Sequence, residues 1–185
     1  SMIMKPGAQM LLFLIDSTMT NHIILCAFGT TTRAKETYDF LEKRITPCFP
    51  TAKLHWAFSS PTVRKISAKK GGTPTASIEA IISRLRNPGK IVIQSLHILP
   101  GYEFDRLVSE STSLDVRAAV GMPLLHERSD FSRVALALKG LVDNSGQSAA
   151  LVLGHGTNHP CRASYITLEN ELIRQIGPQV FFTTI

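Results

Sequence analysis

One histidine of this chain follows an apolar segment at a point where α/β proteins often carry reactive side chains. His155 lies between Gly154 and Gly156, directly after the apolar run of residues 149–153. Such a run is typical of a buried parallel strand, and ligands of open α/β sheets bind outside the carboxyl ends of the strands. The flanking glycines allow a sharp turn and leave the imidazole uncrowded. We therefore predict that His155 is presented to a ligand; a histidine that only hydrogen-bonds its own loop is the alternative.

A second histidine, His159, follows His155 at the spacing of a zinc-binding HxxxH pair. The two residues do not share a helix, because Gly156 intervenes and Pro160 opens the next helical pattern. Joint metal binding by both histidines is therefore the less favoured interpretation.

Two more candidates come from the segment around residue 100. Glu103 stands at the start of a predicted helix, where the helix dipole also favours a carboxylate, so a reactive role and a capping role are equal alternatives. His97 lies inside an apolar strand pattern. A buried, supporting histidine is the favoured interpretation there.

Short β-rich runs alternate with helical patterns at intervals of roughly 30 residues, the length of one βα unit. The predicted strands cover residues 22–29, 53–59, 90–98, 116–122, 148–154 and 179–185. The predicted helices begin near Arg33, Thr73 (as N-cap, before Pro74), Gly101, Arg128 and Pro160. This alternation predicts an α/β fold, a parallel sheet flanked by helices on both faces.

Polar and turn-forming residues gather where the predicted strands end, and we expect them to form one rim with His155 and Glu103. They are Phe28, Gly29, Thr30, Thr31, Ser59, Ser95, Pro123 and Leu124. The turn at Gly29 has the composition of an anion-binding turn but lacks the lysine of a P-loop. A serine hydrolase is disfavoured because the chain has no GxSxG motif. A histidine phosphatase is disfavoured because Gly154 stands where that motif carries an arginine.

The composition fits a globular domain with a core, since 44% of the 185 residues are hydrophobic. The net charge is +6, and the basic residues are scattered, which favours an anionic small ligand over a nucleic acid. Cys26, Cys48 and Cys161 show no CxxC spacing, so a reducing, cytoplasmic setting is expected. The apolar segment 10–15 is short for a signal-peptide core and for a membrane span, so no membrane partner is expected.

Six sequence blocks occur in an order that resembles a known enzyme family. They are LCAFGT at 25–30, AFSS at 57–60, TP at 73–74, IQSLHI at 93–98, GMPLL at 121–125 and LGHGTNH at 153–159. These blocks resemble the anaerobic-type sirohydrochlorin cobaltochelatases, class II chelatases that are related in fold to ferrochelatase. The resemblance extends from about His22 to Ile185, and the QSLHI and GHG blocks are its most specific parts.

The resemblance implies ATP-independent insertion of Co²⁺ into sirohydrochlorin, a tetrapyrrole whose many carboxylates suit a basic protein. It implies that His155 is the catalytic histidine, a metal ligand and proton acceptor, and that Glu103 is the rim glutamate. The strand-end residues would then contact the tetrapyrrole, and no nucleotide is expected. Two alternatives remain: an Fe²⁺ chelatase for sirohaem or haem synthesis, and a tetrapyrrole- or metal-binding module without turnover.

Members of this family have two similar halves that face the tetrapyrrole cleft. The resemblance implies that this chain is the first half, with an N-terminal extension at 1–21, an α/β domain at 22–178 and the start of a second half at 179–185. A second ligating histidine and a further glutamate ligand would lie beyond Ile185. We expect such a half-site to bind Co²⁺ weakly and to turn over poorly unless two copies pair as a homo-oligomer.

Overall fold

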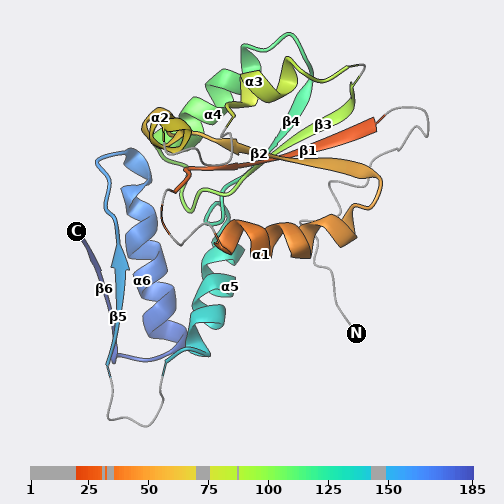
Figure 1. The fold of residues 1–185 in the computed structure, drawn as a ribbon. Helices are drawn as coiled ribbons and strands as arrows, with labels where there is room; N and C mark the ends of the chain where they lie inside the picture. Colours follow the sequence, from red (N-terminus) through yellow and green to blue (C-terminus); the bar gives the residue numbers. More distant parts are fainter. Residues whose placement is uncertain (1–19, 31, 33–35, 70–75, 87, 143–148) are drawn as a thin grey trace. The chain divides into compact units, whose positions relative to one another are not determined.

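The computed structural model describes residues 20–30, 32, 36–69, 76–86, 88–142 and 149–185 (Figure 1). Its strands are β1 (Thr20–Ala27), β2 (Ala52–Phe58), β3 (Pro88–Ser95), β4 (Ala118–Gly121), β5 (Ala150–Gly154) and β6 (Val180–Thr184). Its α-helices are α1 (Glu36–Ile45), α2 (Pro61–Lys69), α3 (Ile78–Ile82), α4 (Tyr102–Thr112), α5 (Arg128–Lys139) and α6 (Ala163–Gln175), with short 3-10 turns at Thr46–Cys48 and Pro160–Arg162.

The chain divides into two compact units. The first contains the residues up to Gln94 together with Glu110–Gly121, and the second contains Ser95–Ser109 and Met122–Ile185. The strands follow this division, because β1 to β4 form one sheet while β5 and β6 form another. Each unit is described separately below.

The first unit is built on a sheet with the strand order β2-β1-β3-β4. β1 and β2 run parallel, with Asn21 opposite Ala52 and Ala27 opposite Phe58, and β3 and β4 also run parallel. β1 supplies the centre of the core, since every residue from 22 to 27 is buried. Figure 1 shows α1 and α3 on opposite sides of these strands. On the α1 side, the ring of Tyr38 lies 5.0 Å from that of Trp56.

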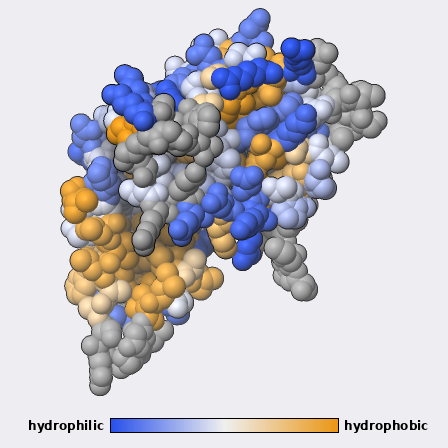
Figure 2. Space-filling view, in the orientation of Figure 1, coloured by the Kyte–Doolittle hydropathy of each residue, from blue (hydrophilic) through white to orange (hydrophobic). Residues whose placement is uncertain are grey.

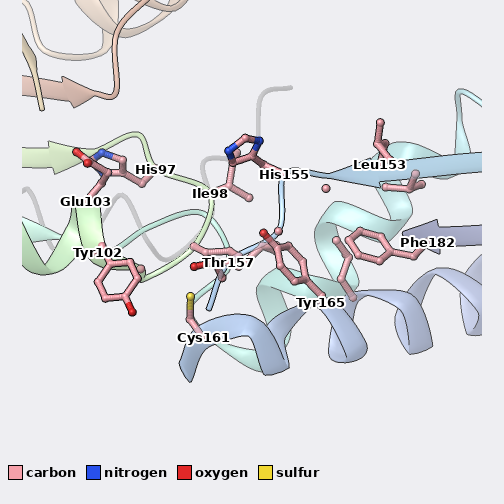
Figure 3. Close-up of a pocket in the computed structure, with 17 residues that line it drawn as sticks. His97, Ile98, Tyr102, Glu103, Leu153, His155, Thr157, Cys161, Tyr165 and Phe182 are labelled. Carbon is pink, nitrogen blue, oxygen red and sulfur yellow. The ribbon is translucent and has the colours of Figure 1, made fainter. Parts of the chain in front are cut away.

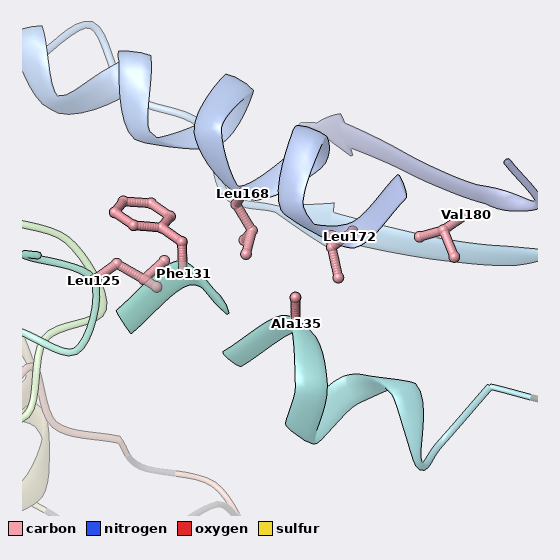
Figure 4. Packing of buried hydrophobic residues seen from close by; sticks show 6 residues of the cluster. All are labelled: Leu125, Phe131, Ala135, Leu168, Leu172 and Val180. Carbon is pink, nitrogen blue, oxygen red and sulfur yellow. The ribbon is translucent and has the colours of Figure 1, made fainter. Parts of the chain in front are cut away.

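The second unit packs two helices on the parallel pair β5–β6. The side chains that join them point into one cluster between α5, α6 and the strands (Figure 4), namely Leu125, Phe131, Ala135, Leu168, Leu172 and Val180. The small Ala135 and the large Leu172 are both fully buried, so the helices approach closely at this point. α5 begins where Asp130 accepts hydrogen bonds from the backbone N–H groups of His126 and Glu127.

The opposite face of the β5–β6 pair is apolar and open. Leu151, Leu153 and Phe181 are 66%, 55% and 55% exposed, and Leu151 lies opposite Phe181 in the register. Figure 2 shows the corresponding hydrophobic surface at the lower left, over the strands of this unit. A continuous apolar face of this kind usually marks a contact with a ligand or another protein surface.

The predicted α/β fold is confirmed, with parallel strands flanked by helices. The structure describes two sheets, with β6 paired to β5 in the second unit. Helix α2 was not among the predicted elements, and α3 begins after Ser77, whose hydroxyl accepts from the Ala80 N–H. The predicted starts at Arg33 and Thr73 lie outside the described residues. No helix in the described ranges is long and apolar enough to cross a membrane.

Candidate functional site

A cavity of about 560 Å³ lies in the second unit (Figure 3). It is lined by residues between 97 and 103, by Leu125, by residues 152–157 at the end of β5 and in the turn that follows, by Cys161, by Tyr165 and Leu168 of α6, and by Phe182 of β6. His155 and Glu103 are both among its lining residues. The structure therefore brings together the two catalytic candidates that the sequence singled out, although 52 positions separate them in the chain.

His155 is exposed, as expected from its position after β5. Gly156 adopts a φ of +80°, a conformation that side-chain-bearing residues rarely adopt, so the predicted sharp turn is present. A Cβ atom at Gly154 would approach the ring of Phe182 to 3.0 Å, and one at Gly156 would approach the carbonyl oxygen of Ile185 to 3.0 Å. The two glycines thus let β6 and its aromatic ring pack closely against the turn that carries His155.

Glu103 points to the same cavity from the first turn of α4. Its Oε1 lies 3.4 Å from Nη1 of Arg106, one helical turn later. Its other oxygen, Oε2, is buried and has no hydrogen-bond partner among the residues that the structure describes. A buried carboxylate oxygen without a partner is costly, and such atoms are typical of positions that bind a ligand.

His97 is 9% exposed, which confirms the prediction of a buried histidine. Its Nδ1 lies 2.9 Å from Oγ of Ser95, and its backbone N–H donates to the same hydroxyl. Burial lowers the pKa of His97, although the negative charge of Glu103 acts in the opposite direction. Figure 3 shows its ring next to Glu103 at one end of the cavity. Ser95 itself is 3% exposed and lies behind His97 rather than on the cavity wall.

His159 is engaged at both ring nitrogens. Nδ1 accepts a hydrogen bond of 3.1 Å from the backbone N–H of Cys161, and Nε2 lies 3.0 Å from Oδ2 of Asp105. No group of three or more histidine, cysteine, aspartate or glutamate side chains able to hold a metal occurs among the described residues. The pairing of His155 and His159 as joint metal ligands therefore has no support in the geometry.

The other predicted rim residues are divided between the two units. Phe28, Gly29, Thr30 and Ser59 belong to the first unit, where Phe28 is 52% exposed and Ser59 is buried, and Thr31 lies outside the described residues. In the second unit, Pro123 is buried and Leu124 is 52% exposed, and the Leu124 N–H donates to the His97 carbonyl. The cavity around His155 is lined by residues of the second unit alone. A shared crevice for all the strand ends stays a prediction.

Sequence reasoning missed much of the apolar wall of this cavity. The rings of Tyr165 and Phe182 stack with their centroids 5.3 Å apart, and both line the cavity together with Leu153. The orientation of Phe182 was predictable from the sequence of β6. Residues two apart in a strand share a face, so Phe182 lies on the same side as the buried Val180. The sequence did not predict that Tyr165 lines the cavity, because its location there depends on how α6 packs against β6.

Comparison with known proteins gives one family and two curated relatives. A family model described as cobalt chelatase (CbiK) matches residues 21–185. The sirohydrochlorin cobaltochelatase CbiKC of Nitratidesulfovibrio vulgaris is 32% identical over 171 residues, which cover 88% of this chain and 60% of that protein. The sirohydrochlorin cobaltochelatase of Salmonella typhimurium is 28% identical over 175 residues, which cover 86% of this chain and 64% of that protein. The chain thus spans less than two thirds of the length of either relative.

Proposed function

This chain belongs to the CbiK cobalt chelatase family, and on that basis we propose that it takes part in ATP-independent insertion of Co²⁺ into sirohydrochlorin. The observation that carries the proposal is the cavity of the second unit. It holds an exposed imidazole, His155, and a carboxylate with one buried oxygen that lacks a protein partner, Glu103. Metal insertion needs both kinds of group, because two pyrrole protons must leave as a hydrated divalent ion is delivered.

We assign His155 the central role in this chemistry. An imidazole accepts protons near neutral pH and also binds first-row divalent metals, so it suits either step of the insertion. No hydrogen bond to its ring comes from the residues that the structure describes, which leaves its nitrogens open to substrate. His155 would thus act as proton acceptor and as the protein's contact to the incoming Co²⁺.

Glu103 would act as the second acid–base group. Glu103 is one of the residues that line the cavity, and a carboxyl group there can accept a proton or hydrogen-bond a metal-bound water. We propose that it receives or guides one of the displaced protons and influences which metal is accepted.

The tetrapyrrole would lie on the apolar surface beside His155. Along β5, alternation places His155 on the same side as the exposed Leu151 and Leu153. The net charge of +6 favours capture of a substrate that bears many carboxylates. We extend the substrate-binding surface, as a proposal, to the predicted rim residues Phe28, Gly29, Thr30, Thr31, Ser59, Ser95, Pro123 and Leu124.

The site as described offers the metal few protein ligands, and the open face of β5–β6 adjoins it. We therefore propose that insertion depends on a second surface over this face, supplied by the rest of a two-halved protein or by a paired copy of the chain. The domain boundaries at 21/22 and 178/179 also stay a prediction; in the structure, β6 pairs with β5 within the second unit. The three cysteines, which form no disulfide, fit the proposed cytoplasmic location.

The test is an insertion assay with sirohydrochlorin and Co²⁺, Fe²⁺ or no metal, followed by the change in tetrapyrrole absorbance. We expect Co²⁺ insertion above the rate without protein, rising more than linearly with chain concentration if two copies pair. Sedimentation at the same concentrations reports that pairing directly. Tetrapyrrole binding without insertion at any concentration would favour a binding module, and faster insertion of Fe²⁺ would favour the iron chelatase.

A further inference from the structure

A chain of contacts connects the helix that carries Glu103 to the turn that carries His155. His159 Nε2 lies 3.0 Å from Asp105 Oδ2, although the two residues are 54 positions apart. The ring of Tyr102 meets the His159 ring edge-on, with centroids 4.8 Å apart. The His159 side chain is only 16% exposed, whereas Asp105 meets it from the solvent side and is 60% exposed.

The opposite side of His159 is fixed to its own turn. Its Nδ1 accepts from the Cys161 N–H, and its backbone N–H donates to Oγ1 of Thr157. Because Nδ1 accepts, the ring proton of the neutral form lies on Nε2, which then donates to Asp105. The ring has one orientation and one tautomer in this arrangement.

The location of Asp105 on α4 determines what its contact with His159 does. Asp105 is two residues after Glu103, so the two carboxylates point to different sides of α4. The bond from Asp105 to His159 therefore holds α4 against the turn without occupying Glu103. His155, four residues before His159, shares the cavity with Glu103.

We propose that Asp105 and His159 are positioning residues of the chelatase site, an inference that rests on the proposed function. Their hydrogen bond sets the separation of His155 and Glu103 across the cavity. Neither residue lines the cavity, so neither is assigned contact with the substrate. Asp105 is 60% exposed, and a polar contact this exposed contributes little to global stability, so its effect is expected in the site.

The kinetic test compares four variants with the wild-type chain in the Co²⁺ insertion assay. In Asp105→Ala the bond is lost, and kcat should fall about tenfold with KM for the tetrapyrrole changed less than about twofold, because misplaced reacting groups slow chemistry more than binding. Asp105→Asn keeps an oxygen that accepts the same N–H and should recover most of the rate. His159→Asn keeps an acceptor for the Cys161 N–H but loses the bond to Asp105, so it should match Asp105→Ala. The double variant Asp105→Ala/His159→Asn should be no slower than either single one.

Asp39→Ala is the matched control, since Asp39 is an exposed carboxylate in the first turn of α1. It should leave kcat unchanged. An unchanged kcat in Asp105→Ala, or an Asp105→Asn variant as slow as Asp105→Ala, would overturn the proposal.

A second measurement does not depend on turnover. In ¹H–¹⁵N spectra of the histidine rings, His159 should show the Nε2–H tautomer in the wild type and in Asp105→Asn. Asp105→Ala should keep this tautomer, because the Cys161 N–H still donates to Nδ1, but it should shift the His155 ring signals, whereas Asp39→Ala should not. These spectra decide the link whether or not the chain by itself inserts cobalt: His155 signals that stay unchanged in Asp105→Ala disprove positioning.

Discussion

The His22–His55 pair of the first unit and His155 of the second unit lie in different environments. In the first unit, His22 of β1 and His55 of β2 lie within strands, with Nδ1 of one 2.9 Å from Nε2 of the other and the ring centroids 5.1 Å apart. In the second unit, His155 lies just beyond the end of β5, exposed and facing a cavity. The same side chain is thus a packing element in one unit and a candidate reactive group in the other.

The difference has an electrostatic cause. Burial and the nearby His55 and Lys53 lower the pKa of His22, and burial and Lys53 lower the pKa of His55. The folded protein therefore favours neutral rings in this pair. Their hydrogen bond to each other also occupies one nitrogen of each ring, Nδ1 of His22 and Nε2 of His55. Position along the strand, rather than residue type, decides which histidine is available for chemistry.

The largest effect should come from His155→Ala. Loss of a proton acceptor and metal contact should reduce the rate of Co²⁺ insertion by at least about 100-fold, the range seen when a general base is removed. Insertion is measured from the tetrapyrrole absorbance, and Co²⁺ binding is measured separately. His126→Ala, which removes an exposed histidine of the same unit outside the cavity, serves as control and should keep the wild-type rate. A normal rate in His155→Ala would show that His155 is no more reactive than the His22–His55 pair.

A smaller effect, on stability, should come from Gly156→Ala. The φ of +80° disfavours any side chain, and the new Cβ would lie 3.0 Å from the Ile185 carbonyl oxygen and 3.3 Å from Cβ of Thr184. We expect the free energy of unfolding to fall by about 1–3 kcal/mol, measured by urea denaturation. Gly140→Ala is the control, because Gly140 has a right-handed φ of −68° and a Cβ there would come no closer than 3.7 Å, to the Ala137 carbonyl oxygen. It should be neutral or slightly stabilising, by at most about 1 kcal/mol. Equal losses in both variants would mean that the turn is not constrained.

The smallest effect should be the pH dependence that the His22–His55 pair contributes. The unfolded chain protonates these rings below about pH 6.5, whereas the folded chain does so only at a lower pH because both pKa values are lowered. The contribution of the pair to the unfolding free energy is therefore fully present above that pH. It is lost as the pH falls through the folded-state pKa values. His97, whose pKa is also lowered, adds to the same slope.

His55→Gln should make this slope shallower, by up to about 1 kcal/mol per pH unit, since it removes one titrating ring. Ile24→Val is the matched control: Ile24 lies opposite His55 in the register, and its truncation should cost about 1 kcal/mol at every pH. Urea denaturation between pH 5 and 8, in steps, gives both results. A slope that is the same in all three proteins would show that the pair does not titrate differently on folding.

Local sequence patterns predicted most of the elements and the two catalytic candidates. β1, β2, β5 and β6 begin and end within two residues of the predicted strands, because each is a short run of apolar and β-favouring residues. The prediction that the run before His155 is buried is wrong, since Leu151 and Leu153 are 66% and 55% exposed. β3 is shorter than predicted, since the IQSLHI block leaves the strand after Ser95, where the Ser95 hydroxyl binds the His97 backbone. α2 was missed because its first residue is a proline in a short polar stretch, a pattern shared by helix starts and loops.

The sequence by itself determined the turn at His155, because a glycine on each side of the histidine and an apolar run before it are local features. Only the tertiary structure decided that β5 pairs with β6, since pairing depends on which faces bury each other. It also decided that Phe182 and Tyr165 line the cavity. The hydrogen bond between Asp105 and His159, which are 54 positions apart in the chain, likewise depends on the tertiary structure. Contacts of that length leave no periodic signal in a chain, because they depend on how helices and strands pack rather than on how each one forms.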